Sequence, residues 1–239
     1  PLFRVRGSTG PRYLRLMAYD EYNSGLWGSS PSDPVTYTGE FIWPRLDYYD
    51  SFVLASFTVE PLTDLGTYIP TAPNTVGLNL TDLVTYYGDE MVFGCEAGIG
   101  VYNLTYLKYS YGEDLLDDGD VLHLPDYLEV PEEIEDLTAL AKEIAGDAST
   151  PYGQLKALEE YLETHYEYNL SLPDAPVGVD PLEWFLYESG EGVCTDFNTA
   201  LTLMARCLGV PARLVGGYYI DPAATSQDVY PIQAHAFTE

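Results

Sequence analysis

A cysteine and a histidine are the two residues of this chain whose types and surroundings suggest covalent chemistry. Cys194 follows a glycine-rich turn, Gly190–Gly192, and directly precedes an amphipathic run that ends near Leu208. His235 lies further on, in the strand-like segment Gln-Ala-His-Ala-Phe. A thiolate can attack a carbonyl carbon, while an imidazole draws the thiol proton and later delivers it to the leaving amine. The pair therefore suggests a nucleophile and its general base.

The position of Cys194 at the start of a predicted helix favours this role. A helix N-terminus carries roughly half a positive charge, which stabilises a thiolate over a thiol. The first amides of a helix have no partner inside it, so the N–H of Cys194 can donate to a developing oxyanion. Phe197, Leu201 and Met204 follow on one face, and at 3.6 residues per turn Cys194 points the same way as Leu201. We therefore expect the thiol to face inward.

A structural interpretation of the same two residues remains open. Cys194 would then be a small buried side chain, and His235 a surface histidine with ordinary hydrogen-bond partners. Only a fold that returns a strand beside the helix can bring these residues together. Spacing alone does not choose between the two interpretations.

Two regions of different pattern must position these residues. Residues 1–124 contain short strand-like runs rich in Tyr, Val and Thr and separated by turn signals, which predict an all-β domain, a sandwich or partial barrel. From residue 125 the pattern is helical, with helices expected to begin at Pro131, at Pro151 and at Cys194. Strands are expected over residues 212–220 and 232–237, joined by a polar stretch. The sequence thus predicts an α+β chain with domains 1–124 and 125–239.

The composition excludes several classes of partner. The chain has 239 residues and a net charge of -28, from 38 acidic residues against 10 Lys and Arg. Such a chain repels nucleic acid and anionic lipid surfaces. The acids are spread along the sequence, which favours a solvated surface over a patch for a cationic partner. No apolar run is long enough to span a membrane, and no signal-peptide pattern is present at Pro1. The sequence begins mid-stream, at Pro-Leu-Phe-Arg-Val-Arg, so we expect an excised segment of a larger protein.

The remaining cysteines and the acidic residues do not form a pattern typical of a cofactor site. If Cys194 stays a thiol, at most one disulfide is possible, Cys95–Cys207; the alternative is three thiols with two of them buried. The three histidines and three cysteines lack the close spacing of a metal site. A Ca²⁺ ion on the acidic loop Asp114–Asp120 is conceivable, but the loop lacks the full EF-hand pattern and an ordinary solvated turn is the alternative. We therefore expect no cofactor.

Several motifs between residues 123 and 239, taken together and in order, resemble the transglutaminase-like superfamily, whose fold is papain-related. They are His123-Leu-Pro-Asp126, Ser149-Thr-Pro-Tyr152, residues 158–168, residues 180–186, Gly192-Val-Cys194, residues 208–218 and His235-Ala-Phe-Thr-Glu239. The branch that they resemble is that of the membrane-anchored microbial proteins with an extracytoplasmic transglutaminase-like domain. Residues 12–27 also resemble the segment that precedes the core in that branch.

The resemblance implies a core of helices packed on an antiparallel sheet, with Cys194 as nucleophile and His235 as general base. It makes Tyr168 a candidate for the group beside the oxyanion, although a core or surface tyrosine is the alternative. Arg213 is expected to fix its strand through contacts with carboxylates or carbonyls rather than to touch substrate.

Two departures from the family pattern stand out. The family's third catalytic residue is an aspartate a dozen or more residues beyond the histidine, whereas the sequence given ends at Glu239. The resemblance therefore implies a core truncated at its C-terminal end, which can be inactive because the aspartate orients the imidazole. Phe237 also replaces the usual tryptophan.

The function implied is thiol-dependent acyl transfer, or peptide or amide hydrolysis, through a thioester on Cys194. The substrate would be a protein or peptide, and the domain would lie on the extracytoplasmic face of the membrane in a membrane-anchored parent protein. The superfamily contains cross-linking enzymes, peptidases and inactive members, so the acyl acceptor stays open. The alternative is a non-catalytic cell-surface binding or scaffolding module on the same fold.

Overall fold

The computed structural model describes residues 1–7, 10–30, 33–39, 42, 52–80, 84–87, 91–95, 98–109, 121, 123–131, 134 and 136–239. The chain forms two compact units, each assembled from three segments. Unit 1 consists of Pro1–Ala18, Pro31–Tyr111 and Val215–His235, and unit 2 of Tyr19–Ser30, Gly112–Leu214 and Ala236–Glu239. A division after residue 124 does not follow these units, because each takes segments from both sides of that position.

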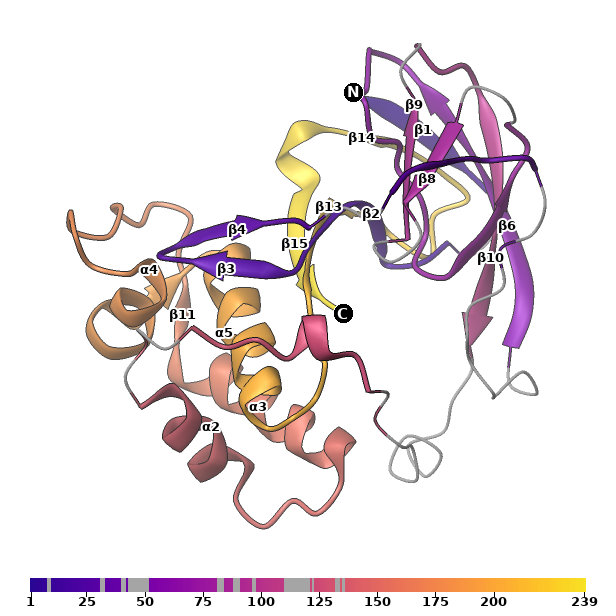
Figure 1. The fold of residues 1–239 in the computed structure, drawn as a ribbon. Coiled ribbons are helices and arrows are strands. Elements are labelled where there is room, and N and C mark those ends of the chain that lie inside the picture. The colour runs from indigo at the N-terminus through magenta and orange to yellow at the C-terminus, as the bar shows by residue number, and fades with distance from the viewer. Residues whose placement is uncertain are drawn as a thin grey trace. The chain divides into compact units, whose positions relative to one another are not determined.

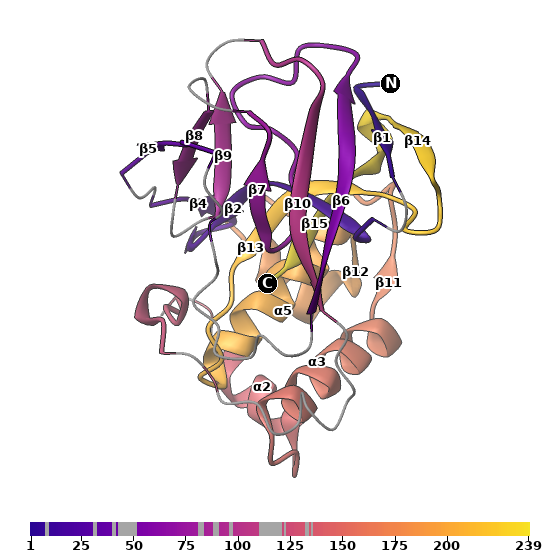
Figure 2. The same cartoon turned by 90° about the vertical axis from the view of Figure 1, so that its right-hand side faces the viewer.

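Unit 1 contains a five-stranded antiparallel sheet of order β14-β1-β6-β10-β7 (Figure 2). Its strands are β1 (Phe3–Arg6), β6 (Phe52–Pro61), β7 (Thr75–Leu78), β10 (Tyr102–Tyr109) and β14 (Ser226–Val229). Alternate residues of β1 face the core: Phe3 and Val5 are buried, and Arg4 binds Asp228 of β14 with Nε 2.5 Å from Oδ1. The strands predicted for this region thus form a sheet, and one face of that sheet is buried.

A smaller sheet of order β5-β8-β9 completes the core of unit 1. Its strands are β5 (Val35–Thr36), β8 (Val84–Tyr87) and β9 (Val92–Cys95). Buried side chains from both sheets form one cluster, in which Tyr37 and Phe93 of this region pack with Phe3 and Leu104 of the larger sheet. Burial of this continuous apolar surface is the main stabilising contribution to the unit.

The prediction that residues 221–230 only join two strands is wrong, because β14 forms within them. Val229 is fully buried there, and Asp228 is held by Arg4. A four-residue strand with one strongly apolar residue leaves too short an alternation to be recognised in sequence. A further sheet of order β15-β13-β2 comprises β2 (Tyr13–Tyr19), β13 (Leu214–Tyr219) and β15 (Ala234–Thr238), close to the strands predicted.

Unit 2 is built on three helices that contact one another (Figure 1). These are α2 (Leu137–Ala145), α3 (Pro151–His165) and α5 (Cys194–Cys207). Shorter elements are η2 (Pro125–Tyr127), α4 (Pro181–Glu183), the π-helical η3 (Trp184–Ser189) and the parallel pair β11 (Glu167–Tyr168) and β12 (Glu191–Gly192). No helix in the described residues combines the length and the apolar composition needed to cross a bilayer.

Two of the three helix starts follow the prediction, and one does not. α3 begins at Pro151 with Thr150 as its cap, whose Oγ1 accepts a hydrogen bond from the Gly153 amide at 3.1 Å. α5 begins at Cys194. α2 begins at Leu137 rather than Pro131, because Asp136 adopts a left-handed φ of 61°, which interrupts a right-handed helix.

A hairpin from early in the sequence belongs to unit 2. It consists of β3 (Glu21–Asn23) and β4 (Leu26–Gly28) (Figure 1). The hydroxyl of Tyr22 donates to Oδ1 of Asp180 at 2.7 Å, at the start of α4. Nε1 of Trp27 donates to Oγ1 of Thr199 on α5 at 2.9 Å. The hairpin therefore ties α4 to α5, although sequence reasoning placed it in an N-terminal β domain.

A buried arginine joins the end of α5 to the same hairpin. Arg206 is only 3% exposed, and its Nε donates to the Ala212 carbonyl at 2.7 Å. Its Nη1 donates to the carbonyls of Asp20 at 2.8 Å and Glu129 at 2.9 Å. Burial lowers the pKa of Arg206, but a guanidinium remains charged in proteins. One side chain with several N–H groups thus holds three backbone segments.

We predict that Arg206→Met lowers the free energy of unfolding by about 3 kcal/mol. Methionine occupies similar space but leaves three carbonyl oxygens without their donor, and each such loss costs about 1–3 kcal/mol. Urea unfolding followed by circular dichroism measures the change. Arg12→Met, at an exposed arginine, is the control and should change stability by less than about 0.5 kcal/mol. Equal losses in the two variants would contradict the role given to Arg206.

Candidate active site

Cys194 is the first residue of α5, and its side chain is half-buried. The turn into the helix is fixed by Asp196, whose Oδ2 accepts a hydrogen bond from the Val193 amide at 2.8 Å. Burial raises the pKa of Asp196. This carboxylate caps the helix that begins at Cys194, as an acidic residue in a first turn commonly does.

The residue two before the cysteine has no room for a side chain. A Cβ placed on Gly192 would lie 2.7 Å from the ring of Phe185 and 2.8 Å from the Cβ of Asp196. Such distances are shorter than van der Waals contact, so β12 can approach α5 this closely only with glycine. Gly192, in the glycine-rich turn noted in the sequence, thus allows the close approach of β12 to Phe185 and Asp196.

The apolar face predicted for α5 lies against the core of unit 2. Ala200 and Met204 are buried there, and Phe197, Leu201 and Leu208 are partly buried against the same cluster. This burial fixes the rotation of the helix about its axis, since any turn would expose these side chains. The first residue of α5 is therefore held on a rigid element.

Tyr168 lies next to Cys194 in unit 2. Tyr168 pairs with Gly192 in the β11–β12 ladder, and its ring centroid is 6.0 Å from that of Phe197 on the first turn of α5. Burial raises the pKa of Tyr168; the Cys194 thiolate charge and a hydrogen bond with the Cys194 side chain raise it further, while a hydrogen bond from the Cys194 amide opposes them. The hydroxyl is thus protonated at neutral pH and lies at both the thiol and the amide of Cys194.

His235 is half-buried on β15, in unit 1. Its ring is stacked on that of Tyr13, with centroids 5.4 Å apart and an angle of 2° between the planes. Tyr13 in turn contacts Tyr219 edge-on at 6.0 Å. Stacking on a tyrosine restricts the orientation of an imidazole ring.

The structure thus brings together some of the predicted residues. It places Tyr168 at Cys194 within unit 2, and it stacks His235 on Tyr13 within unit 1. The pairing of Cys194 with His235 stays a prediction. Tyr13 was not identified from sequence, although it lies in the segment of residues 12–27 that resembles the family, and that resemblance is the signal that could have found it.

Arg213 has the structural contacts that were predicted for it. Its Nη2 lies 3.0 Å from Oε2 of Glu239, and its Nη1 donates to the Tyr127 hydroxyl at 3.3 Å. Arg213 directly precedes β13 and Glu239 directly follows β15, so the ion pair links these two strands. Arg213 therefore fixes strands, as expected, and contacts a carboxylate to do so.

The other cysteines do not form the disulfide that sequence left possible, since Cys95 and Cys207 are both thiols. Cys95 is buried, and burial raises the pKa of Cys207. Within the described ranges no group of three or more His, Cys, Asp and Glu side chains is arranged to hold a metal ion. The acidic loop Asp114–Asp120 lies outside the described residues.

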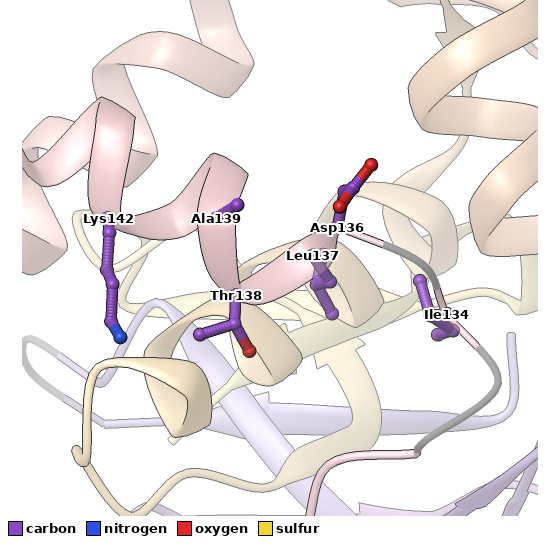
Figure 3. Close-up of a pocket in the computed structure, with 6 residues that line it drawn as sticks. All are labelled: Ile134, Asp136, Leu137, Thr138, Ala139 and Lys142. Atoms are coloured by element: carbon purple, nitrogen blue, oxygen red, sulfur yellow. The ribbon is translucent and has the colours of Figure 1, made fainter.

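An open pocket of about 430 Å³ lies over the first turns of α2 (Figure 3). It is lined by Ile134, Asp136, Leu137, Thr138, Ala139 and Lys142. Thr138 donates to Sγ of Cys207, the last residue of α5, at 3.4 Å. At 1.5 Å per residue, this end of α5 lies about 20 Å along the helix from Cys194. The pocket is therefore separate from the candidate nucleophile.

Comparison with known proteins supports the resemblance seen in the sequence. Residues 138–239 match the model of the Transglutaminase-like superfamily. The chain is 28% identical over 125 residues to an uncharacterised protein of Bacillus subtilis, YebA. It is 30% identical over 104 residues to a protein-glutamine gamma-glutamyltransferase of Pseudomonas aeruginosa. These matches cover 47% and 42% of this chain but only 17% and 15% of the relatives, so the chain spans a small part of their length.

The fold is also that of a solved structure. The crystal structure of the periplasmic domain of TgpA from Pseudomonas aeruginosa superimposes with a TM-score of 0.72 and 18% sequence identity, over 99% of this chain and 82% of that one. The α+β fold predicted from sequence, with a β-rich N-terminal region and helices packed with antiparallel sheet, is confirmed by this likeness.

We predict that Tyr168→Phe raises the pKa of the Cys194 thiol and slows its reaction at neutral pH several-fold. The variant keeps the ring but removes a hydroxyl that donates to the thiolate, and a donor to the charged form lowers a thiol pKa. The rate of modification by a neutral aromatic disulfide, followed against pH, measures the change.

Tyr187→Phe is the matched control, because Tyr187 is an exposed tyrosine of the same unit, and the Cys207 thiol is among the groups that raise its pKa. It should leave the Cys194 profile unchanged. Superimposable profiles for wild type and Tyr168→Phe would rule out a hydrogen bond from Tyr168 to the thiolate.

Proposed function

We propose that the transglutaminase-like domain catalyses thiol-dependent acyl transfer or amide hydrolysis, with Cys194 as nucleophile and His235 as general base. The observation that carries the proposal is the position of Cys194 at the first residue of α5, with the Tyr168 hydroxyl at its thiol and its amide. A helix N-terminus and a nearby donor both stabilise a thiolate, which is the reactive form of cysteine. An inert structural cysteine needs neither.

The proposed reaction has two halves. In the first, His235 removes the thiol proton, Sγ attacks the carbonyl carbon, and a tetrahedral oxyanion forms; its collapse breaks the C–N bond, and His235 returns the proton to the leaving amine or ammonia. In the second, water or a primary amine attacks the thioester and the thiol is regenerated. The Cys194 amide and the Tyr168 hydroxyl are the proposed donors to the oxyanion.

Two contacts support a role for His235. Its ring is held by the stack on Tyr13. The residue that follows it in the chain, Ala236, accepts a hydrogen bond from Nδ2 of Asn198 at 3.0 Å, and Asn198 lies four residues after Cys194 on α5. The strand that carries the proposed base is therefore bonded, one residue further on, to the helix that carries the proposed nucleophile.

The proposed substrate class is supported by the chemistry of a thiol nucleophile and by the relatives. A relative from Pseudomonas aeruginosa is a protein-glutamine gamma-glutamyltransferase, and we propose that this domain likewise acts on proteins or peptides, at a glutamine side chain or a peptide carbonyl. The chain has a net charge of -28 and therefore repels nucleic acid, which is not an expected partner. We further propose an extracytoplasmic location and a membrane-anchored parent, in line with the periplasmic domain whose fold it shares.

A second candidate function is non-catalytic binding of a protein partner. The observation that favours it is the exposure of apolar side chains on the segment between β11 and α4, among them Leu170 and Val177. Exposed apolar residues on one segment are typical of an interaction site. Such a module would not need a reactive thiol, so the reactivity of Cys194 separates the two functions.

We predict that iodoacetamide labels Cys194 rapidly at pH values well below 8, and that His235→Ala slows this labelling by about 100-fold, the scale of general-base effects. Mass spectrometry of peptides from the native protein gives the rate at each pH. Cys207 is an internal control in every sample, because burial raises the pKa of its thiol and it should react slowly in both proteins. Slow labelling of Cys194 with no effect of the variant would favour the binding module instead.

The products distinguish hydrolysis from transfer. A glutamine peptide incubated with a primary amine in ¹⁸O-labelled water should yield an ¹⁸O-labelled carboxylate if water is the acceptor, and a secondary amide if the amine is. Cys194→Ala should abolish either product, because the thioester cannot form.

A further inference from the structure

The first turns of α5 carry a polar residue that no motif singled out. Asn198 lies one turn after Cys194 on the same side of the helix, and its side chain is half-buried. We propose that Asn198 is a positioning residue that fixes the helix turn of Cys194 against the strand that carries His235. This inference rests on the proposed function and adds to it a residue that sets the geometry of the site.

The amide group of Asn198 bonds two segments at once. Its Nδ2 donates to the carbonyl oxygen of Cys194 at 2.9 Å and to the carbonyl oxygen of Ala236 at 3.0 Å. Oγ1 of Thr238 lies 3.1 Å from Oδ1 of Asn198 and 3.1 Å from the Asn198 carbonyl oxygen, and these two atoms share the single hydrogen that Thr238 donates. One side chain thus contacts the backbone of the proposed nucleophile and the backbone of the residue next to the proposed base.

The orientation of this amide is dictated by its partners. Backbone carbonyl oxygens can only accept hydrogen bonds, so the side of Asn198 that faces Cys194 and Ala236 must be the nitrogen, which has two N–H groups. The oxygen then faces Thr238, whose hydroxyl can donate. Neither leucine nor alanine at this position could bridge the two carbonyls, and an aspartate would repel both.

A threonine pair extends the network deeper into unit 2. Oγ1 of Thr202, which is fully buried on α5, lies 3.0 Å from Oγ1 of Thr238. A hydroxyl has one hydrogen, so if Thr238 donates to Asn198 then Thr202 must donate to Thr238. The order of donors therefore runs from Thr202 through Thr238 to Asn198, and from Asn198 to the two carbonyls. Thr202 contributes to the same helix–strand contact without touching Cys194.

This arrangement matters for reactivity rather than only for folding. A nucleophile and its base must be held within hydrogen-bond reach, and a displacement of about 1 Å can cost on the order of 100-fold in rate. Asn198 joins the carbonyl of Cys194 to that of Ala236. A small shift of β15 along α5 would therefore change the lengths of these two hydrogen bonds directly. Thr202, which lies one turn further along α5, can stabilise the contact without setting this distance.

The test compares the pH dependence of Cys194 alkylation by iodoacetamide in the whole chain and in four variants. Asn198→Leu keeps the size of the side chain and removes its hydrogen bonds, and Asn198→Ala is a smaller replacement in case leucine disturbs folding. Thr202→Val is the matched control, because it keeps the shape and removes the hydroxyl at the other end of the network. His235→Ala gives the profile of a thiol without its base.

We expect both Asn198 variants to shift the profile toward that of His235→Ala and to slow labelling at low pH by about 10- to 100-fold. Thr202→Val should lower the melting temperature while staying within about twofold of the wild-type rates, which separates positioning from stability. Wild-type rates in folded Asn198 variants, or equal slowing in Thr202→Val, would overturn the positioning role of Asn198 but leave the proposed Cys194–His235 pair in place. Identical profiles for wild type and His235→Ala would instead overturn the proposed pair, and this inference with it.

Discussion

The immobilisation of α5 is the constraint on which the rest of unit 2 depends. The helix is held along its whole length by polar contacts to different segments: Asn198 near its start bonds Ala236, Thr199 in its middle bonds Trp27, and Arg206 at its end bonds three carbonyls. Its apolar face packs against the core between these points. A side chain at the first residue of such a helix has little freedom to move, and pre-organisation of this kind is what a covalent mechanism needs from its nucleophile.

These contacts also explain why unit 2 is assembled from distant segments. The hairpin β3–β4 donates to α5 and to the start of α4 through two aromatic side chains, Trp27 and Tyr22. Both side chains combine an apolar ring that packs with a polar atom that bonds, which suits them to join elements at the edge of a core. The matched domain of residues 138–239 therefore relies on residues far outside it.

The elements with strong local patterns could be predicted from sequence, and the long-range ones could not. The bounds of α5 and the start of α3 follow from a cap, a proline and a regular apolar stripe. The strand β14 and the left-handed Asp136 have no such pattern. The membership of the hairpin in unit 2, the stack of Tyr13 on His235 and the bonds of Asn198 depend on contacts between residues that local periodicity does not connect. Tyr168 was named from the family resemblance, and only the structure placed its hydroxyl at Cys194.

The central claim is that Cys194 and His235 form one site, and a bifunctional haloketone tests it most directly. A reagent such as dibromoacetone alkylates a reactive thiol first and then the nearest nucleophile that its short bridge can reach. Our account predicts that digestion of the treated native protein yields a peptide in which Cys194 is joined to His235, and that prior denaturation prevents the link. Full modification of Cys194 in the native protein without any link to His235 would contradict the claim.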